Sequence, residues 1–219
     1  MTKLADWLRA ETTDQDIASA ILSMAAAGAE IGRVLREAPI SGQTGLAGSE
    51  NVQGEAQKSL DVISNDVVLN HLRQNPAISI LVSEELDEEV HLSSQGALMV
   101  ATDPLDGSSN LDVNVTVGTI FSILPAAGGL LQSGRQQLAA GYVAYGPATS
   151  LVVRISGDTS VFTLNDQGEW VMTLAKAVVP VASGEFAINT ARERFWDAAT
   201  TGYVRESIAG ETGPAGKRY

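Results

Sequence analysis

Apolar residues recur at helical spacing in two stretches of the chain. The first stretch runs from Ile17 to Leu35, and we expect Thr13 to cap this helix and Pro39 to end it. The second stripe consists of Leu60, Ile63, Val67 and Leu72. Asp61 lies beside the apolar face of this second helix, where a carboxylate needs a partner.

Two continuous apolar runs predict buried strands that each lead into acidic residues. Residues 77–82 lead into Glu84 and Glu85, and residues 97–102 lead into Asp103. Adjacent carboxylates at the end of a buried strand repel each other unless cations or protons offset the charge. The two strand ends are therefore candidates for a metal site.

The residues after the second run suit phosphate chemistry. Pro104 should block continuation of the strand, and a turn should bring Asp106 back toward Asp103. Gly107, Ser108 and Ser109 offer backbone N–H groups and hydroxyls to an anionic oxygen. Hard carboxylates recruit Mg²⁺ or Mn²⁺.

Each of these features also has a purely structural interpretation. Asp, Pro, Gly and Ser are common turn formers, so the segment 103–110 could be only a polar turn. Acidic residues at 87–89 fit a solvated loop, and Asp61 could pair locally. Together, in this order, the acids favour a metal site.

Further strands are expected downstream. They cover residues 112–124, 142–145, 151–155, 161–164 and 169–174, and residues 165–168 should turn the last two into a hairpin. The Gly-rich segment 41–49 matches no phosphate-loop spacing and is interpreted as a surface loop. The pattern predicts an α+β fold of stacked layers with a mixed, largely antiparallel sheet.

A domain boundary is expected within residues 176–183, where the hairpin region gives way to a polar helical stretch. The prediction is an N-terminal metal- and phosphate-binding domain over residues 1–177. The start of a second α/β domain would cover residues 178–219.

Composition narrows the function classes. A net charge of −12 disfavours nucleic acid as a partner, because phosphates would be repelled over the surface. No apolar run reaches membrane-spanning length and the first residues lack a secretory pattern, so we expect a cytoplasmic protein without membrane insertion. The chain has no cysteine and two histidines, which leaves carboxylate oxygens as the multi-ligand donors.

Several blocks of this sequence resemble class I fructose-1,6-bisphosphatase. These blocks are residues 58–66, 81–85, 103–110 and 117–121, with further pieces at 139–146 and 186–189. The pattern of Glu84, Glu85 and residues 103–107 is shared with inositol monophosphatases. The serines, Asn110 and the V-G-T-I-F segment favour the sugar bisphosphatase branch.

The resemblance implies hydrolysis of the 1-phosphate of fructose 1,6-bisphosphate, in gluconeogenesis or the Calvin cycle, with two or more Mg²⁺ ions. The implied metal ligands are Glu84, Asp103, the Leu105 carbonyl, Asp106 and, where the family has an aspartate, Glu55. Asp61 and Glu85 would polarise the attacking water. The removed phosphate would bind Gly107, Ser108 and Ser109, and the retained phosphate would bind Asn189, Arg218 and Tyr219.

The resemblance also implies a homo-oligomer, a dimer or tetramer, with Arg218 reaching a neighbouring subunit's site. Inhibition by AMP is not expected, because residues 9–16 match the nucleotide loop of animal enzymes poorly. The family continues for roughly a hundred residues beyond Tyr219, well over half of a usual domain length. We therefore expect little turnover from these 219 residues alone.

Two alternatives stay open on the sequence. The first is a related phosphatase acting on sedoheptulose 1,7-bisphosphate, an inositol phosphate or a nucleotide 3′-phosphate, with the same carboxylates and a different pocket. The second is a module that binds metal and phosphate without turnover.

Overall fold

The computed structural model describes residues 1–41, 46–50, 56–181 and 186–213. Contacts between Cα atoms divide the chain into two compact units, residues 1–177 and residues 178–219. Each unit is described by itself below.

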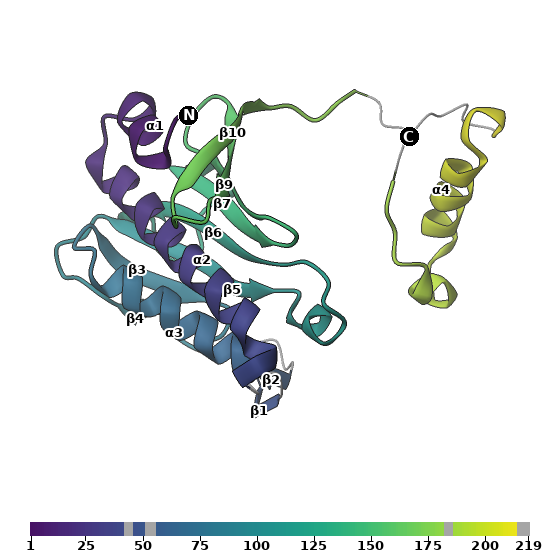
Figure 1. The fold of residues 1–219 in the computed structure, drawn as a ribbon, viewed down its shortest axis with the longest axis horizontal. Coiled ribbons are helices and arrows are strands. Elements are labelled where there is room, and N and C mark those ends of the chain that lie inside the picture. The colour runs from purple at the N-terminus through teal and green to yellow at the C-terminus, as the bar shows by residue number, and fades with distance from the viewer. Residues whose placement is uncertain (42–45, 51–55, 182–185, 214–219) are drawn as a thin grey trace. The chain divides into compact units, whose positions relative to one another are not determined.

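An eight-stranded sheet forms the centre of the first unit (Figure 1). The strands, in spatial order, are β10 (Trp170–Ala177), β9 (Thr159–Leu164), β8 (Thr149–Arg154), β7 (Ala139–Tyr145), β6 (Val117–Pro125), β5 (Leu98–Asp106), β3 (Ile78–Ser83) and β4 (Val90–His91). β3 and β5 pair in parallel, and every other neighbouring pair in this sheet is antiparallel. The prediction of an α+β fold with a mixed, largely antiparallel sheet is confirmed.

Helices cover one face of this sheet (Figure 1). They are α1 (Leu4–Glu11), α2 (Gln15–Ser41) and α3 (Ser59–Arg73). Their apolar stripes bury Leu8, Ile21 and Leu72 in a common core with the inward side chains of the strands. The second helical stripe is confirmed, and Asp61 is buried within it at 4% exposure.

The ends of α2 differ from the prediction. Asp14, and not Thr13, caps the helix, because Asp14 Oδ1 accepts hydrogen bonds from the N–H groups of Asp16 and Ile17 at 3.0 and 3.1 Å. Pro39 lies inside the last turn, and the helix ends at Ser41. Aspartate and threonine are both good caps, and the side chain that reaches the first turn decides between them.

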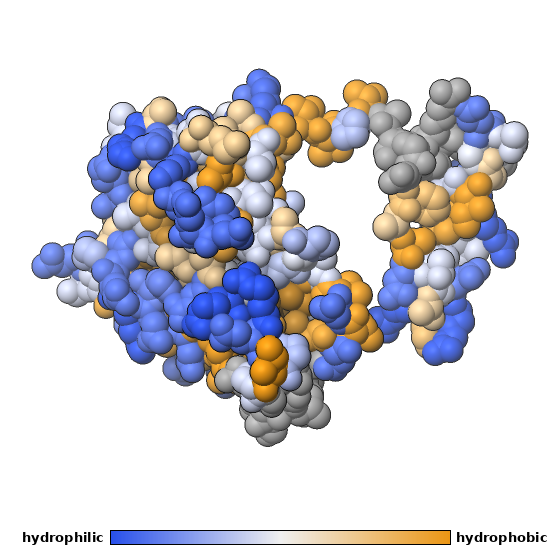
Figure 2. Space-filling model, in the orientation of Figure 1, coloured by the Kyte–Doolittle hydropathy of each residue, from blue (hydrophilic) through white to orange (hydrophobic). Residues whose placement is uncertain are grey.

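By length and composition alone, α2 is a helix that could cross a membrane, since its most apolar stretch has a mean hydropathy of 1.3. In this fold 56% of that stretch is buried against the rest of the protein. Figure 2 shows hydrophilic residues over much of the surface of the first unit in the same view. The packing identifies α2 as the core helix of the first unit.

Two strand predictions need correction. β5 continues past Pro104 to Asp106, and its pairing with β6 shifts register between Asp103 and Asp106. This bulge removes Pro104 from the ladder, so its missing N–H interrupts no regular pairing. Residues 112–116 are not part of a strand, because a 3₁₀ helix covers Ser108–Val113 and β6 begins only at Val117.

The other downstream strands and the turn are confirmed. Asn165 N–H donates to the Glu169 carbonyl at 2.9 Å, and Gly168 adopts a left-handed φ of 77° in the β9–β10 hairpin.

The expected loop at 41–49 contains β1 (Leu46–Glu50), which pairs with β2 (Ala56–Lys58), while residues 42–45 lie outside the described residues. Helix α1 was not predicted.

The second unit contains little regular structure in its described part. A 3₁₀ helix covers Thr190–Phe195, and α4 follows over Ala198–Ala209. Asp197 caps α4 by accepting a hydrogen bond from Thr200 N–H at 2.7 Å, and this bond lowers the pKa of the Asp197 carboxyl. A polar helical stretch in this region is thereby confirmed.

Candidate active site

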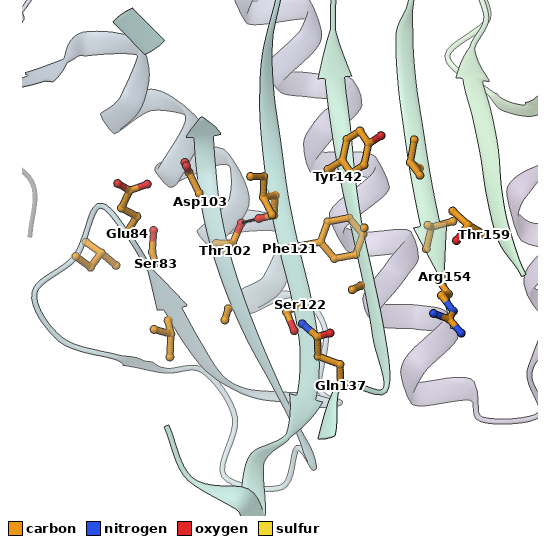
Figure 3. Close-up of a pocket in the computed structure, with 18 of the residues that line it drawn as sticks. Ser83, Glu84, Thr102, Asp103, Phe121, Ser122, Gln137, Tyr142, Arg154 and Thr159 are labelled. Carbon is orange, nitrogen blue, oxygen red and sulfur yellow. Dashed lines mark hydrogen bonds between the residues drawn. The ribbon is translucent and has the colours of Figure 1, made fainter. Parts of the chain in front are cut away.

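The two acidic strand ends lie at one edge of the sheet because β3 and β5 run parallel. Ser83 pairs with Thr102 in the ladder, and Glu84 N–H then donates to the Thr102 carbonyl at 3.1 Å. The next residues, Glu84 after β3 and Asp103 within β5, therefore lie side by side. Figure 3 shows their side chains at the ends of neighbouring strands.

Asp103 is the most perturbed acid of this edge. Burial, a hydrogen bond to the Glu84 carboxyl and the charge of Glu84 raise the pKa of Asp103 to about 7. The Leu105 N–H donates to Asp103 Oδ1 at 3.0 Å and partly opposes this rise, while the charge of Asp106 adds to it. Two carboxyl groups can hydrogen-bond only when they hold a proton between them. A cation could replace that proton.

The β3 end is held from helix α3. Ser83 donates from its hydroxyl to Asn65 Oδ1 at 2.7 Å, and both side chains are buried. The same Ser83 oxygen accepts a hydrogen bond from the Glu85 N–H at 3.3 Å. The backbone that carries Glu84 and Glu85 is thus fixed by a hydrogen-bonded pair in the core.

Asp61 also belongs to this edge. Its Oδ2 accepts a hydrogen bond from the Ser108 hydroxyl at 3.3 Å, which joins α3 to the segment that follows β5. Gly107 precedes Ser108 in a left-handed conformation, with φ 80°, and so starts the 3₁₀ helix that contains Ser108 and Ser109. The first N–H groups of such a helix have no partner within it.

The acids do not form one tight cluster. Among the residues that the structure describes, no group of three or more His, Cys, Asp or Glu side chains is arranged to hold a metal ion. Glu84 and Asp103 form one pair, and Asp61 with Ser108 forms another. Leu105 is buried and the neighbouring Asp106 is exposed.

A groove of about 830 Å³ begins at the acid pair and crosses the sheet face. Its lining includes Ile120 of β6. Figure 3 labels two further lining residues, Tyr142 of β7 and Arg154 of β8. Ile120 and Tyr142 are each 47% exposed, so apolar surface lies beside the acids. The arrangement offers negative charge at one end and Arg154 at the other.

Four predicted site residues lie either outside the described residues or in the second unit. Glu55, Arg218 and Tyr219 lie outside the described residues. Asn189 is exposed in the second unit, where its Oδ1 accepts a hydrogen bond from Ala191 N–H at 3.1 Å.

The sequence pattern did not identify Asn65 as a site residue, although it lies in the block 58–66. In the helical pattern, Asn65 looked like a polar side chain on the solvent face. Only the 2.7 Å bond to the Ser83 hydroxyl shows that it holds a strand end. The sequence places Asn65 four residues after Asp61, on the same face of the helix, and this spacing was the available signal.

Comparison with known proteins shows that this chain matches a known protein family. The profile of the family "Fructose-1-6-bisphosphatase, N-terminal domain" matches residues 4–175. A class 1 fructose-1,6-bisphosphatase of Neisseria meningitidis serogroup A is 45% identical, over 99% of this chain and 68% of its own length. The corresponding protein of Shewanella amazonensis is 42% identical, over 100% of this chain and 71% of its own length. The crystal structure of Leishmania major fructose-1,6-bisphosphatase in holo form is 27% identical with a TM-score of 0.90, over 100% of this chain and 71% of that one.

Proposed function

The chain belongs to the fructose-1,6-bisphosphatase family, and from this premise we propose that it hydrolyses the 1-phosphate ester of fructose 1,6-bisphosphate in a Mg²⁺-dependent reaction. The products are fructose 6-phosphate and inorganic phosphate. The observation that carries the proposal is the family match over residues 4–175, which include Asp61, Glu84, Glu85, Asp103 and Asp106.

The donor set at the sheet edge fits a hard divalent cation. Mg²⁺ commonly binds one or two carboxylates and completes its shell with water and substrate phosphate oxygens. Glu84 and Asp103 supply two such carboxylates, with the Leu105 carbonyl and Asp106 as further oxygen donors. Once bound there, Mg²⁺ would neutralise phosphoryl oxygens, lower the pKa of a bound water and stabilise the leaving alkoxide.

Asp61 and Glu85 are the residues proposed to orient the attacking water and accept its proton. Asp61 is held by the Ser108 hydroxyl, and Glu85 by its N–H bond to Ser83. A general base must have a fixed position within hydrogen-bond reach of the proton that it removes. Each base is therefore anchored through a different hydroxyl.

The segment after Asp106 is proposed to bind the transferred phosphate. The left-handed Gly107 directs the chain into the 3₁₀ helix, so the N–H groups and hydroxyls of Ser108 and Ser109 become available for phosphate oxygens. Asn189, Arg218 and Tyr219 are proposed for the retained 6-phosphate, on the resemblance alone.

Phosphate release from fructose 1,6-bisphosphate, measured with Mg²⁺ and again with EDTA, tests the function. We expect Mg²⁺-dependent release with fructose 6-phosphate as the product, weak in these 219 residues alone and stronger in a protein that also carries the part of its relatives that this chain does not cover. Asp61→Asn should lower kcat by about 10²- to 10⁴-fold, the usual contribution of a positioned acid or base. Asp66→Asn is the matched control, because Asp66 is exposed on the same helix. Release from sedoheptulose 1,7-bisphosphate or inositol phosphate alone would contradict the substrate assignment.

The same premise supports a homo-oligomer that works in the cytoplasm in carbohydrate metabolism. Sedimentation velocity of the purified chain tests the assembly. A dimer or tetramer agrees with the proposal, and a monomer at micromolar concentration contradicts it.

A further inference from the structure

Two buried hydroxyl groups connect the helix layer to the acidic edge. Thr119 in β6 is fully buried, and its hydroxyl donates to the Pro104 carbonyl at 2.9 Å. The Tyr145 hydroxyl at the end of β7 lies 2.7 Å from the Thr119 oxygen. Because the single proton of Thr119 is used on Pro104, Tyr145 must be the donor to Thr119. Burial raises the pKa of Tyr145 well above its usual value, which keeps this donor protonated.

The Pro104 carbonyl lies in the bulge, where the regular pairing of β5 with β6 is interrupted. The Thr119 hydroxyl therefore supplies its hydrogen-bond donor. Asp103 pairs with Ile120 and Asp106 pairs with Gly118, so Pro104 and Leu105 together lie opposite the single residue Thr119 in the bulge. A carbonyl inside a bulge is free to rotate with its peptide plane unless something binds it. Thr119 lies directly across this gap and fixes the plane that joins Pro104 to Leu105.

The Tyr145 ring is in turn fixed by helix α2. A Cβ atom built on Gly32 would lie 3.4 Å from ring atoms of Tyr145, and one on Gly28 would lie 3.5 Å from its hydroxyl. The absence of side chains at these two positions brings the helix backbone close to the ring. The position of the phenol is therefore set by packing between α2 and the sheet.

We propose that Thr119 and Tyr145 are positioning residues that hold the Pro104–Leu105 peptide, so that Asp103, the Leu105 carbonyl and Asp106 face one ligand. The inference deepens the proposed function and rests on it for the identity of that ligand. Neither residue touches the reacting atoms. They act through the backbone of the bulge.

The test compares Thr119→Val, Thr119→Ser and Tyr145→Phe in the purified chain. Hydrogen exchange of the peptide covering residues 103–107, without metal, reports the backbone directly. Calorimetric titration with Mg²⁺ reports ligand binding without turnover, and phosphate release reports kcat and KM. Thr163→Val, the same change on β9 far along the sheet, controls for loss of a threonine hydroxyl.

Thr119→Val should speed exchange in residues 103–107 and weaken Mg²⁺ binding by about tenfold to a hundredfold, the range typical for outer partners of a metal site. Thr119→Ser keeps the hydroxyl and should restore both values. Tyr145→Phe leaves the Thr119 bond to Pro104 and should give a smaller change in the same direction. This variant also serves if Thr119→Val does not fold.

Unchanged exchange and unchanged Mg²⁺ affinity in both Thr119→Val and Tyr145→Phe would overturn the inference. Failure of the proposed function has a different signature. In that case the wild-type chain itself neither binds Mg²⁺ nor releases phosphate, while faster exchange in Thr119→Val still supports the hold on the bulge.

Discussion

The two acidic strand ends carry the same chemistry but are supported by different layers of the fold. The end of β3 is held from helix α3, through the bond between Ser83 and Asn65. The end of β5 is held from within the sheet, through Thr119 and Tyr145. The carboxylates of the proposed site thus depend on two separate buried contacts.

This difference has a physical origin in the two strands. β3 ends in regular pairing, so a side chain from the covering helix suffices to fix the next peptide. β5 ends in a bulge that leaves the Pro104 carbonyl outside the ladder, and Thr119 of the neighbouring strand β6 binds it. Each support can therefore be removed without removing the other.

The largest expected effect comes from removing a carboxylate of the pair itself. Asp103→Asn should lower kcat/KM for phosphate release by at least about a hundredfold, because even outer partners of a metal site contribute tenfold to a hundredfold. The thermal unfolding temperature in EDTA should stay equal or rise, since one of two repelling acids is neutralised. Glu88→Gln, an exposed acid beyond β3, is the matched control. Retained activity in Asp103→Asn would contradict the site.

Removal of the helix-side support should have a smaller effect. Asn65→Ala leaves the buried Ser83 hydroxyl without its acceptor and should lower the free energy of unfolding by about 1–3 kcal/mol. Activity should fall less than in Asp103→Asn, because both carboxylates remain. Urea unfolding measures the free energy of unfolding. Asn70→Ala, exposed on the same helix, should change it by less than about 0.5 kcal/mol, and equal losses in the two variants would refute the role of Asn65.

The sheet-side support can be probed from α2. A Cβ on Gly28 would lie 2.7 Å from Val143 Cγ2, so Gly28→Ala should overpack the contact between helix and sheet. The free energy of unfolding should fall by about 1 kcal/mol. Overpacking costs about 1–3 kcal/mol, and the higher helix propensity of alanine offsets part of that cost. Gly32→Ala meets its nearest atoms at 3.4 Å and should be neutral or stabilising. Thermal unfolding of the two variants would show no difference if α2 did not pack as described.

A further effect concerns the pH dependence of stability without metal. The folded pKa of Asp103, about 7, lies above the ordinary value of 3.8, so the folded state binds this proton more tightly than the unfolded chain does. The associated stability is present below about pH 4 and is lost as the pH rises toward 7. Asp103→Asn should flatten this part of the curve, measured by urea unfolding in EDTA from pH 4 to pH 8. An unchanged slope would contradict the interaction between Glu84 and Asp103.

Much of the fold was predictable because its signals are local. Periodicity identified α2 and α3, apolar runs identified β3 and β5, and the turn residues at 165–168 identified the last hairpin. Helix α1 and the 3₁₀ helix after Gly107 were missed, because short segments carry too few periods to be recognised. Continuation of β5 past Pro104 was missed because a bulge is a property of two strands.

The sequence by itself determined which chemistry is present: the acids at the ends of two buried strands, the small residues after them and the family to which the blocks belong. Only the tertiary structure decided how those acids are held. The parallel pairing of β3 with β5 brought Glu84 against Asp103, and the packing of α2 and α3 on the sheet selected Asn65, Thr119 and Tyr145 as supports. Periodicity is encoded in neighbouring residues, whereas a hydrogen bond between residues 15 to 26 positions apart exists only once the layers have packed.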